Sequence, residues 1–295
     1  MAQRARDAQL LFLVQRQAQV RQQIAATVTA QVLAIVRALL AGRWYDPAAQ
    51  AKATPELARV VRLGQVQTAN VTGAYLDAVL RDLGASPARG TVTLPADLRG
   101  IPAEVEWERP AKTYRSGIKL LGLDDLEAAQ RAENRATQLA ADDLDAAMRS
   151  AARQRLASVD KVTGFRRVIH PEASRGGTCG LCIAAAHRTY HRSDLLPVHG
   201  GCKCEVFPIV SGKADPSPTW NERDISALYR EVLKASGSTA AADLRKARVS
   251  VAQHGELGPV LVDDGHRFRS QEQAAGDIRN TSEAAIVADD QAPAA

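Results

Sequence analysis

Cysteine, aromatic residues and long apolar runs are all scarce in this chain of 295 residues. Its four cysteines all fall within residues 176–204. Aromatic residues make up 4% of the chain, and many of its apolar residues are alanine. This composition suits long helices packed in bundles better than a broad β-sandwich.

No apolar stretch approaches the roughly 18 residues that a transmembrane helix needs. The N-terminus begins like a signal peptide, with basic residues before an apolar run from Leu10 to Val14. That run is too short, and Gln15 and Arg16 end it without a small-residue cleavage site. We therefore expect a soluble protein made in the cytosol, without a membrane partner. In that compartment clustered cysteines mark a metal site more often than disulfides.

Motifs of common enzymes are also missing. The sequence has no G-x-S-x-G nucleophile elbow, no H-E-x-x-H zinc motif and no G-x-x-x-x-G-K phosphate loop. The catalytic residues are therefore unknown, and an enzymatic role is uncertain and less favoured than a structural one.

Helical periodicity dominates the first half of the chain. Apolar residues from Leu10 to Leu39 recur mainly at steps of three and four. Thr54 and Pro55 predict the start of a second helix, which continues to Gly84. The range 85–110 is expected to be a connection. A strongly helical stretch follows Asp124.

Strand-like segments appear after Gly164. Residues 165–170 and 204–210 predict short strands, the second at a sheet edge because it contains Pro208. A helix is expected from Asp224 to Leu233, then a hairpin within 248–264 and a loose tail. The expected fold is a mainly α N-terminal helical region followed by a small α+β module with a zinc clip. The expected domains are 1–160, helical; 161–212, the Cys/His module; and 213–295, the linker, helix, hairpin and tail.

The cysteine segment has the spacing of a zinc site. Cys179 and Cys182 form a C-x-x-C pair, in which two thiolates can bind one metal across a tight turn. His199, Cys202 and Cys204 form the second half. Five candidate ligands thus compete for about four tetrahedral positions, and the spacing does not decide which four bind.

Two other interpretations of this segment remain open. The thiols could be buried or could form oxidation-prone pairs without metal. His170 and Glu172 also form the H-x-E pattern of zinc nucleobase deaminases, which precedes P-C-x-x-C. Here Thr178 precedes Cys179, the gap from Glu172 to Cys179 is short, and Cys202 and Cys204 would have no role. This interpretation is therefore disfavoured.

Residues 165–210 resemble the C-terminal module of phage Mu F-like minor head proteins. The matching positions are the C-x-x-C of Cys179 and Cys182, the aromatic Tyr190, and the closing His199, Cys202 and Cys204. Gly200 stands where the family often has Pro, and Lys203 where it often has Arg. The match is nearest to versions from actinobacterial tailed phages, which are often labelled capsid maturation protease.

The resemblance implies a minor capsid protein inside the head, near the portal, acting in head morphogenesis. Its expected partners are the portal protein, the major capsid protein or both, in an oligomeric assembly. One alternative is a capsid maturation protease. Another is a zinc-containing protein that contacts packaged DNA, since the net charge is +5 and the first helix is basic. Its basic residues are Arg4, Arg6, Arg16, Arg21, Arg37 and Arg43.

Overall fold

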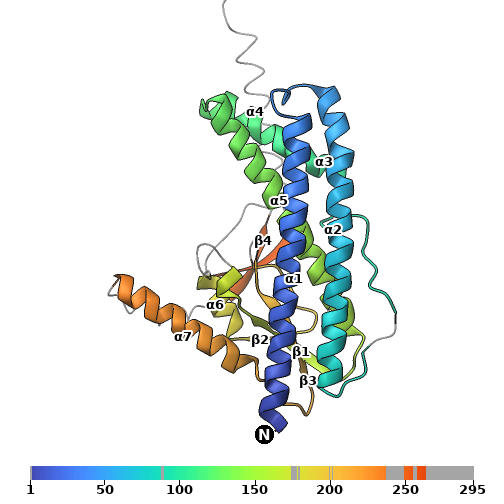
Figure 1. The fold of residues 1–295 in the computed structure, drawn as a ribbon, viewed down its shortest axis with the longest axis vertical. Helices are drawn as coiled ribbons and strands as arrows, with labels where there is room; N and C mark the ends of the chain where they lie inside the picture. The colour runs from blue at the N-terminus through green and yellow to red at the C-terminus, as the bar shows by residue number, and fades with distance from the viewer. Residues whose placement is uncertain are drawn as a thin grey trace, which may run out of the picture.

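The computed structural model describes residues 2–87, 90–173, 178, 180–198, 200, 202–236, 249–254 and 258–263. Five helices come first: α1 (Ala2–Leu39), α2 (Pro47–Asp82), α3 (Ala103–Trp107), α4 (Arg109–Leu121) and α5 (Asp125–Ala157). The later elements are β1 (Val162–Val168), η1 (Pro171–Ala173), α6 (Gly180–Ala186), β2 (Thr189–His191), β3 (Glu205–Val210), α7 (Ser217–Ser236), β4 (Val249–His254) and β5 (Gly258–Asp263). The predicted order, a helical region followed by a small α+β part, is confirmed (Figure 1).

Helices α1, α2 and α5 pack along one another (Figure 1). All three helices come into close contact at Gly64 of α2. A Cβ atom there would lie 2.5 Å from Val28 Cγ2 on α1 and 2.9 Å from Leu144 Cδ2 on α5. Since such distances are shorter than carbon contacts allow, glycine is what lets the three helices meet.

The predicted start of the second helix at Thr54 and Pro55 is wrong. Helix α2 begins at Pro47, where Asp46 accepts a hydrogen bond from the Ala48 amide at 2.9 Å. Asp46 and Pro47 thus supply the same cap-and-proline signal eight residues earlier. Thr54 is buried at 8% exposure, so its side chain packs in the core instead of capping.

The last part of the predicted connection over 85–110 is also wrong, because α3 and the start of α4 lie in it. Their aromatic side chains explain why. Trp107 and Tyr114 are buried, and the Tyr114 ring stacks on Trp44 with centroids 5.0 Å apart. Packing of these aromatic side chains in one cluster with Trp44, in the chain after α1, therefore stabilises α3 and the start of α4.

The small sheet has strand order β2-β1-β3, and both pairings are antiparallel. Strand β3 is an edge strand, so the interpretation of Pro208 is confirmed. A Cβ atom on Gly164 would lie 2.4 Å from the Tyr190 carbonyl oxygen, so glycine permits the close pairing of β1 with β2.

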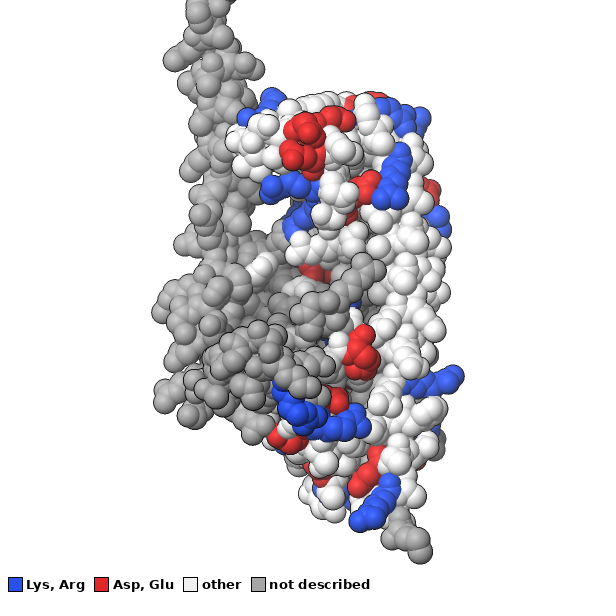
Figure 2. Space-filling view, turned by 60° about the vertical axis from the view of Figure 1, so that its left-hand side comes forward, with Lys and Arg blue, Asp and Glu red and all other residues white. Residues whose placement is uncertain are grey.

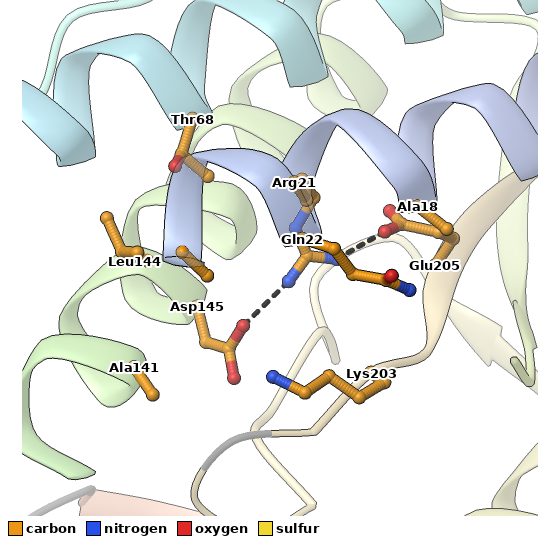
Figure 3. Close-up of a pocket in the computed structure, with 10 residues that line it drawn as sticks. Ala18, Arg21, Gln22, Thr68, Ala141, Leu144, Asp145, Lys203 and Glu205 are labelled. Atoms are coloured by element: carbon orange, nitrogen blue, oxygen red, sulfur yellow. Dashed lines mark hydrogen bonds and ion pairs between the residues drawn. The ribbon is translucent and has the colours of Figure 1, made fainter. Parts of the chain in front are cut away.

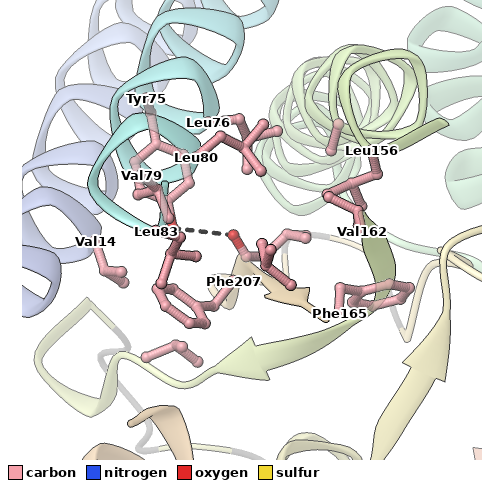
Figure 4. Packing of buried hydrophobic residues seen from close by; sticks show 14 of the residues in the cluster. Val14, Tyr75, Leu76, Val79, Leu80, Leu83, Leu156, Val162, Phe165 and Phe207 are labelled. Atoms are coloured by element: carbon pink, nitrogen blue, oxygen red, sulfur yellow. Dashed lines mark hydrogen bonds between the residues drawn. The ribbon is translucent and has the colours of Figure 1, made fainter. Parts of the chain in front are cut away.

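One hydrophobic cluster joins the helices to the sheet (Figure 4). It includes Leu76 and Leu80 of α2 together with Phe165 of β1 and Phe207 of β3. The Tyr75 hydroxyl donates a hydrogen bond to the Val206 carbonyl at 3.0 Å. This shared cluster packs the sheet against α2. The helical region ends at Ala157, and the first strand begins at Val162.

Helix α7 begins at Ser217, seven residues before the predicted start at Asp224. Asp215 accepts a hydrogen bond from the Ser217 amide at 3.0 Å, a local cap that the prediction overlooked. The predicted hairpin is confirmed as the antiparallel pair β4 and β5. The predicted loose tail, from residue 264 on, lies outside the described residues.

Candidate functional site

Three of the four cysteines lie close together in one buried cluster. Cys182 lies on α6, and Cys202 and Cys204 lie just before β3. Cys182 Sγ is 3.7 Å from Cys202 Sγ, and Cys202 Sγ is 3.0 Å from Cys204 Sγ. The three side chains are 6%, 5% and 4% exposed. We call Cys182, Cys202 and Cys204 the thiol cluster.

The segments that carry the thiol cluster are held by aromatic packing. The Tyr190 ring of β2 stacks on Phe165 of β1 with centroids 5.3 Å apart. Its hydroxyl donates a hydrogen bond to the Ala185 carbonyl at the end of α6, at 3.1 Å. Tyr190 therefore joins α6 to the sheet, which gives a physical role to the aromatic position singled out in the sequence.

The sulfur distances bear on what the thiol cluster can bind. Both exceed the S–S bond length of about 2.05 Å in a disulfide. Four thiolates around zinc, each about 2.3 Å from the metal, lie about 3.8 Å from one another. The distance from Cys182 to Cys202, 3.7 Å, matches this spacing, whereas that from Cys202 to Cys204, 3.0 Å, is shorter.

The predicted ligand set is only partly described. Cys179 and His199 lie outside the described residues, so the structure describes three of the five candidates. In the described part of the chain, no three or more His, Cys, Asp or Glu side chains form a group that could hold a metal ion. The described thiols are nevertheless soft donors of the type that zinc prefers.

A buried guanidinium contacts the thiol cluster. Arg167 of β1 is 2% exposed, and its Nη1 donates a hydrogen bond to Cys204 Sγ at 3.3 Å. Its Nη2 donates to the Leu196 carbonyl, and its Cζ lies 5.7 Å from the centroid of the Tyr190 ring. Burial lowers the pKa of Arg167, but the neighbouring sulfurs of Cys204 and Cys202 outweigh burial and raise it.

A buried ion network holds the segment that follows the thiol cluster (Figure 3). Arg21 of α1 contacts Asp145 of α5 at 2.6 Å and Glu205 of β3 at 2.5 Å. Burial raises the pKa values of both carboxyl groups, and Arg21 opposes this shift. Since Glu205 directly follows Cys204, this network ties the cysteine segment to two long helices.

Lys203 lines the same small cavity as this ion network (Figure 3). The cavity measures about 30 Å³, enough for roughly one water molecule. Asp145 Oδ2, which is buried, has no hydrogen-bond partner among the described residues. The cavity is therefore polar but too small for a substrate.

Buried guanidinium groups surround the thiol cluster, together with the carboxylates of Asp145 and Glu205. Arg21, Arg149 and Arg167 all interact electrostatically with Cys202 or Cys204, and all three guanidinium groups are buried or nearly so. Against them, Asp145 is a carboxylate whose pKa is affected by Cys202. Buried cations are costly unless a negative group compensates them. The hydrogen bond with Cys202 and burial nevertheless raise the pKa of the Cys204 thiol well above its usual value, which favours its neutral form when no metal is bound.

The H-x-E pair forms a contact of its own. His170 is 4% exposed, and its Nδ1 lies 2.9 Å from Glu172 Oε1. This hydrogen bond lowers the pKa of Glu172. The buried Nε2 of His170 has no hydrogen-bond partner within the described ranges. The side chains of His170 and Glu172 thus pair with each other.

Sequence reasoning missed the charged residues around the thiol cluster. Arg167 lies in a segment predicted as a strand, but nothing in its spacing marks it as a partner of Cys204. Arg21 was grouped with the basic residues of the first helix. Asp145 and Glu205 carry no local motif at all.

Comparison of the chain with protein-family models, with curated proteins and with solved structures finds no match in any of the three. The resemblance to Mu F-like proteins therefore rests on the residues of the cysteine segment alone.

Proposed function

We propose that this chain is a minor capsid protein of a tailed phage, of the Mu F-like type, acting in head morphogenesis near the portal inside the capsid. The observation that carries the proposal is the position of the motif residues. Cys182, Tyr190, Cys202 and Cys204 all lie in or beside one buried cluster. Convergence of these motif residues in one core is what a structural module requires, and this supports the proposal.

In this proposal the thiol cluster forms part of a structural zinc clip. Cys182, Cys202 and Cys204 would hold the metal with Cys179 or His199. Zinc would supply a cross-link between α6 and the segment before β3, a contribution on the order of 10 kcal/mol to the folding of small metal-bound modules. The buried guanidinium groups of Arg167 and Arg149 support it, because metal-bound thiolates would add negative charge beside them.

The same features favour a structural role over a capsid maturation protease. A cysteine nucleophile must reach a peptide carbonyl. The three described thiols are at most 6% exposed, and Cys204 accepts a hydrogen bond from Arg167. The pKa of Cys204 is well above its usual value, because of its hydrogen bond with Cys202 and because of burial. Such a thiol is a poor nucleophile.

The alternative of DNA binding through the first helix loses part of its support. Of the six predicted basic residues, Arg21 is buried in the ion network and Arg37 pairs with Glu133 at 2.7 Å. Arg6 donates a hydrogen bond to the Asp82 carbonyl. Arg43 donates one to the Ala38 carbonyl at 3.1 Å, so four of the six residues have contacts within the protein.

Virion composition tests the proposal. The chain should be present in purified, DNA-filled particles of the phage that encodes it, at far fewer copies than the major capsid protein. Quantitative mass spectrometry of gradient-purified particles measures this. Absence from both particles and procapsids would contradict the proposal.

A cleavage assay separates the structural role from the protease. The purified chain is mixed with uncleaved major capsid protein, and the products are analysed by mass spectrometry. The structural role predicts no cleavage. Specific cleavage that a point substitution in this chain abolishes would instead establish the protease.

A further inference from the structure

Two neighbouring helices share a surface without charge. Helix α1 has no charged residue over 22–36, and α2 has none over 63–76. Elsewhere these two helices carry Arg, Lys, Asp or Glu at ordinary spacing, as in Arg16 and Arg21 or Arg59 and Arg62. The absence of charge is therefore local.

The two uncharged stretches lie side by side. Gly64 packs against Val28, and Gln17 Nε2 donates a hydrogen bond to Thr72 Oγ1 at 3.1 Å. Gln17 comes before Val28 on α1, but its partner Thr72 comes after Gly64 on α2. The two helices are therefore antiparallel. The uncharged stretches overlap around Val28 and Gly64.

The outward sides of these stretches are exposed to solvent. Leu63 is 55% exposed and Val66 is 41% exposed. Over its most apolar 18 residues α1 reaches a mean hydropathy of 1.2, yet only 17% of that stretch is buried. By length and composition α1 could therefore cross a membrane, which its short apolar runs did not predict. A core helix or a signal sequence near the N-terminus can have the same composition, but a core helix would be mostly buried.

Along the right-hand margin of Figure 2, the described surface is mostly white over its middle part and carries charged groups nearer its ends. We define the neutral face as the exposed residues of both stretches, which are uncharged and both apolar and polar: Gln23, Ala26, Thr27, Ala30, Gln31 and Ala34 of α1, with Leu63, Val66, Gln67, Asn70 and Ala74 of α2.

We propose that the neutral face binds the neutral face of a second copy of this chain across a two-fold axis. In a two-fold contact each surface patch meets itself, so any charge near the axis would face a like charge. Interfaces between unlike proteins, in contrast, use complementary charges to select the partner and orient it. A face without charge on either helix fits contact with itself.

The size of the neutral face limits the strength of this contact. Residues 22–36 of α1 span about 22 Å, and two adjacent helices are about 20 Å wide. The neutral face, taken as a flat rectangle of these dimensions, therefore covers roughly 450 Å². A stable interface buries about 800 Å² on each partner. We therefore expect a reversible dimer with a dissociation constant on the order of micromolar.

Sedimentation velocity of the full chain under reducing conditions, from about 1 to 200 µM, tests this proposal. The parent chain should shift from one copy of 31.6 kDa toward twice that mass as its concentration rises. Ala30→Glu and Leu63→Glu each place a carboxylate on the neutral face, and each should weaken the dimer at least tenfold without changing the circular dichroism spectrum.

Leu126→Glu is the matched control, because Leu126 is 78% exposed on α5, outside the neutral face. It should dimerise as the parent does. A parent chain that stays monomeric over the whole range overturns the proposal, as does an oligomer that neither Ala30→Glu nor Leu63→Glu weakens.

Discussion

Arg167 Nη1 donates a hydrogen bond to Cys204 Sγ at 3.3 Å from a guanidinium that is 2% exposed. This contact places a fixed positive charge beside a sulfur that the sequence marks as a metal ligand. Groups that donate hydrogen bonds to metal ligands orient them and tune their affinity for the metal. The contact therefore links a residue without any motif to the proposed zinc clip.

Replacing this guanidinium should weaken metal retention. In Arg167→Gln the sulfur loses its charged donor, so we expect zinc affinity to fall by about 10- to 100-fold. Competition with a chromophoric chelator measures the affinity. Arg167→Lys should recover part of the loss of zinc affinity, because lysine restores the positive charge but not the planar guanidinium group with its several fixed donors.

Arg166→Gln is the matched control for Arg167→Gln. Arg166 is the adjacent residue on β1, and its guanidinium pairs with Asp215 at 3.1 Å. This variant should lose some stability but keep its zinc. Equal zinc affinity in the parent, Arg166→Gln and Arg167→Gln would show that Arg167 has no part in holding metal.

The metal content itself is a separate prediction. Protein purified without chelator should contain about one zinc per chain, as expected for a tetrahedral Cys/His site. Cys182→Ala and Cys202→Ala should each lose most of it, as measured by elemental analysis. If Cys202 and Cys204 both bind, His199→Ala should keep most of the metal, as should the control His191→Ala. A parent chain without zinc would refute the clip.

Local signals predicted much of the fold. Asp124 caps α5 through its side chain, which accepts a hydrogen bond from the Glu127 amide at 2.8 Å, so the strongest helix start in the sequence was found. Pro208 placed β3 at a sheet edge. The start of α2 was missed because Asp46-Pro47 and Thr54-Pro55 are equivalent local signals. Burial of Ala49 and Ala53 favours the earlier one, and burial depends on the rest of the fold.

The surroundings of the thiol cluster could not be predicted in the same way. Arg21 and Glu205 are 184 positions apart, and Arg21 and Asp145 are 124 apart. In a helical pattern an arginine or an aspartate indicates a solvated face, because most such residues are exposed. Only the docking of α1 and α5 against β3 turns these three residues into a buried network.

The ion network should be sensitive to removal of its cation. Arg21→Met leaves Asp145 and Glu205 buried without their guanidinium, which should cost about 3–5 kcal/mol of unfolding free energy. Urea denaturation measures this. Adding Asp145→Asn and Glu205→Gln to Arg21→Met should recover a large part of the loss, because the buried negative charges are then gone.

Arg37→Met is the control for Arg21→Met, since Arg37 also leaves α1 to contact a carboxylate, that of Glu133, but its side chain is 61% exposed. Exposed pairs contribute about 0–1 kcal/mol. If Arg21→Met destabilised the protein no more than Arg37→Met does, the network would not hold α1 to the sheet.

A second buried carboxylate should make stability depend on pH. Asp143 of α5 is 3% exposed, near Glu106 and 3.6 Å from Arg99 Nη1. Burial and the Glu106 carboxylate raise the pKa of Asp143 to about 7, although Arg99 opposes the shift. Between about pH 4 and pH 7 the folded protein therefore binds more protons here than the unfolded chain does. By linkage, the contribution of Asp143 to stability is largest at low pH and falls as pH rises through this window.

Asp143→Asn removes this titration while keeping the shape of the side chain. Relative to the parent, the variant should gain on the order of 3 kcal/mol of unfolding free energy between pH 5 and pH 8, because only the parent must bury a charge as pH rises. Urea denaturation at both pH values measures the difference. Asp160→Asn, which changes an exposed carboxylate just before β1, should follow the parent at both. If the curves of Asp143→Asn and the parent stayed parallel from pH 5 to pH 8, Asp143 would not titrate in this range, and its pairing with Arg99 would outweigh burial and the repulsion from Glu106.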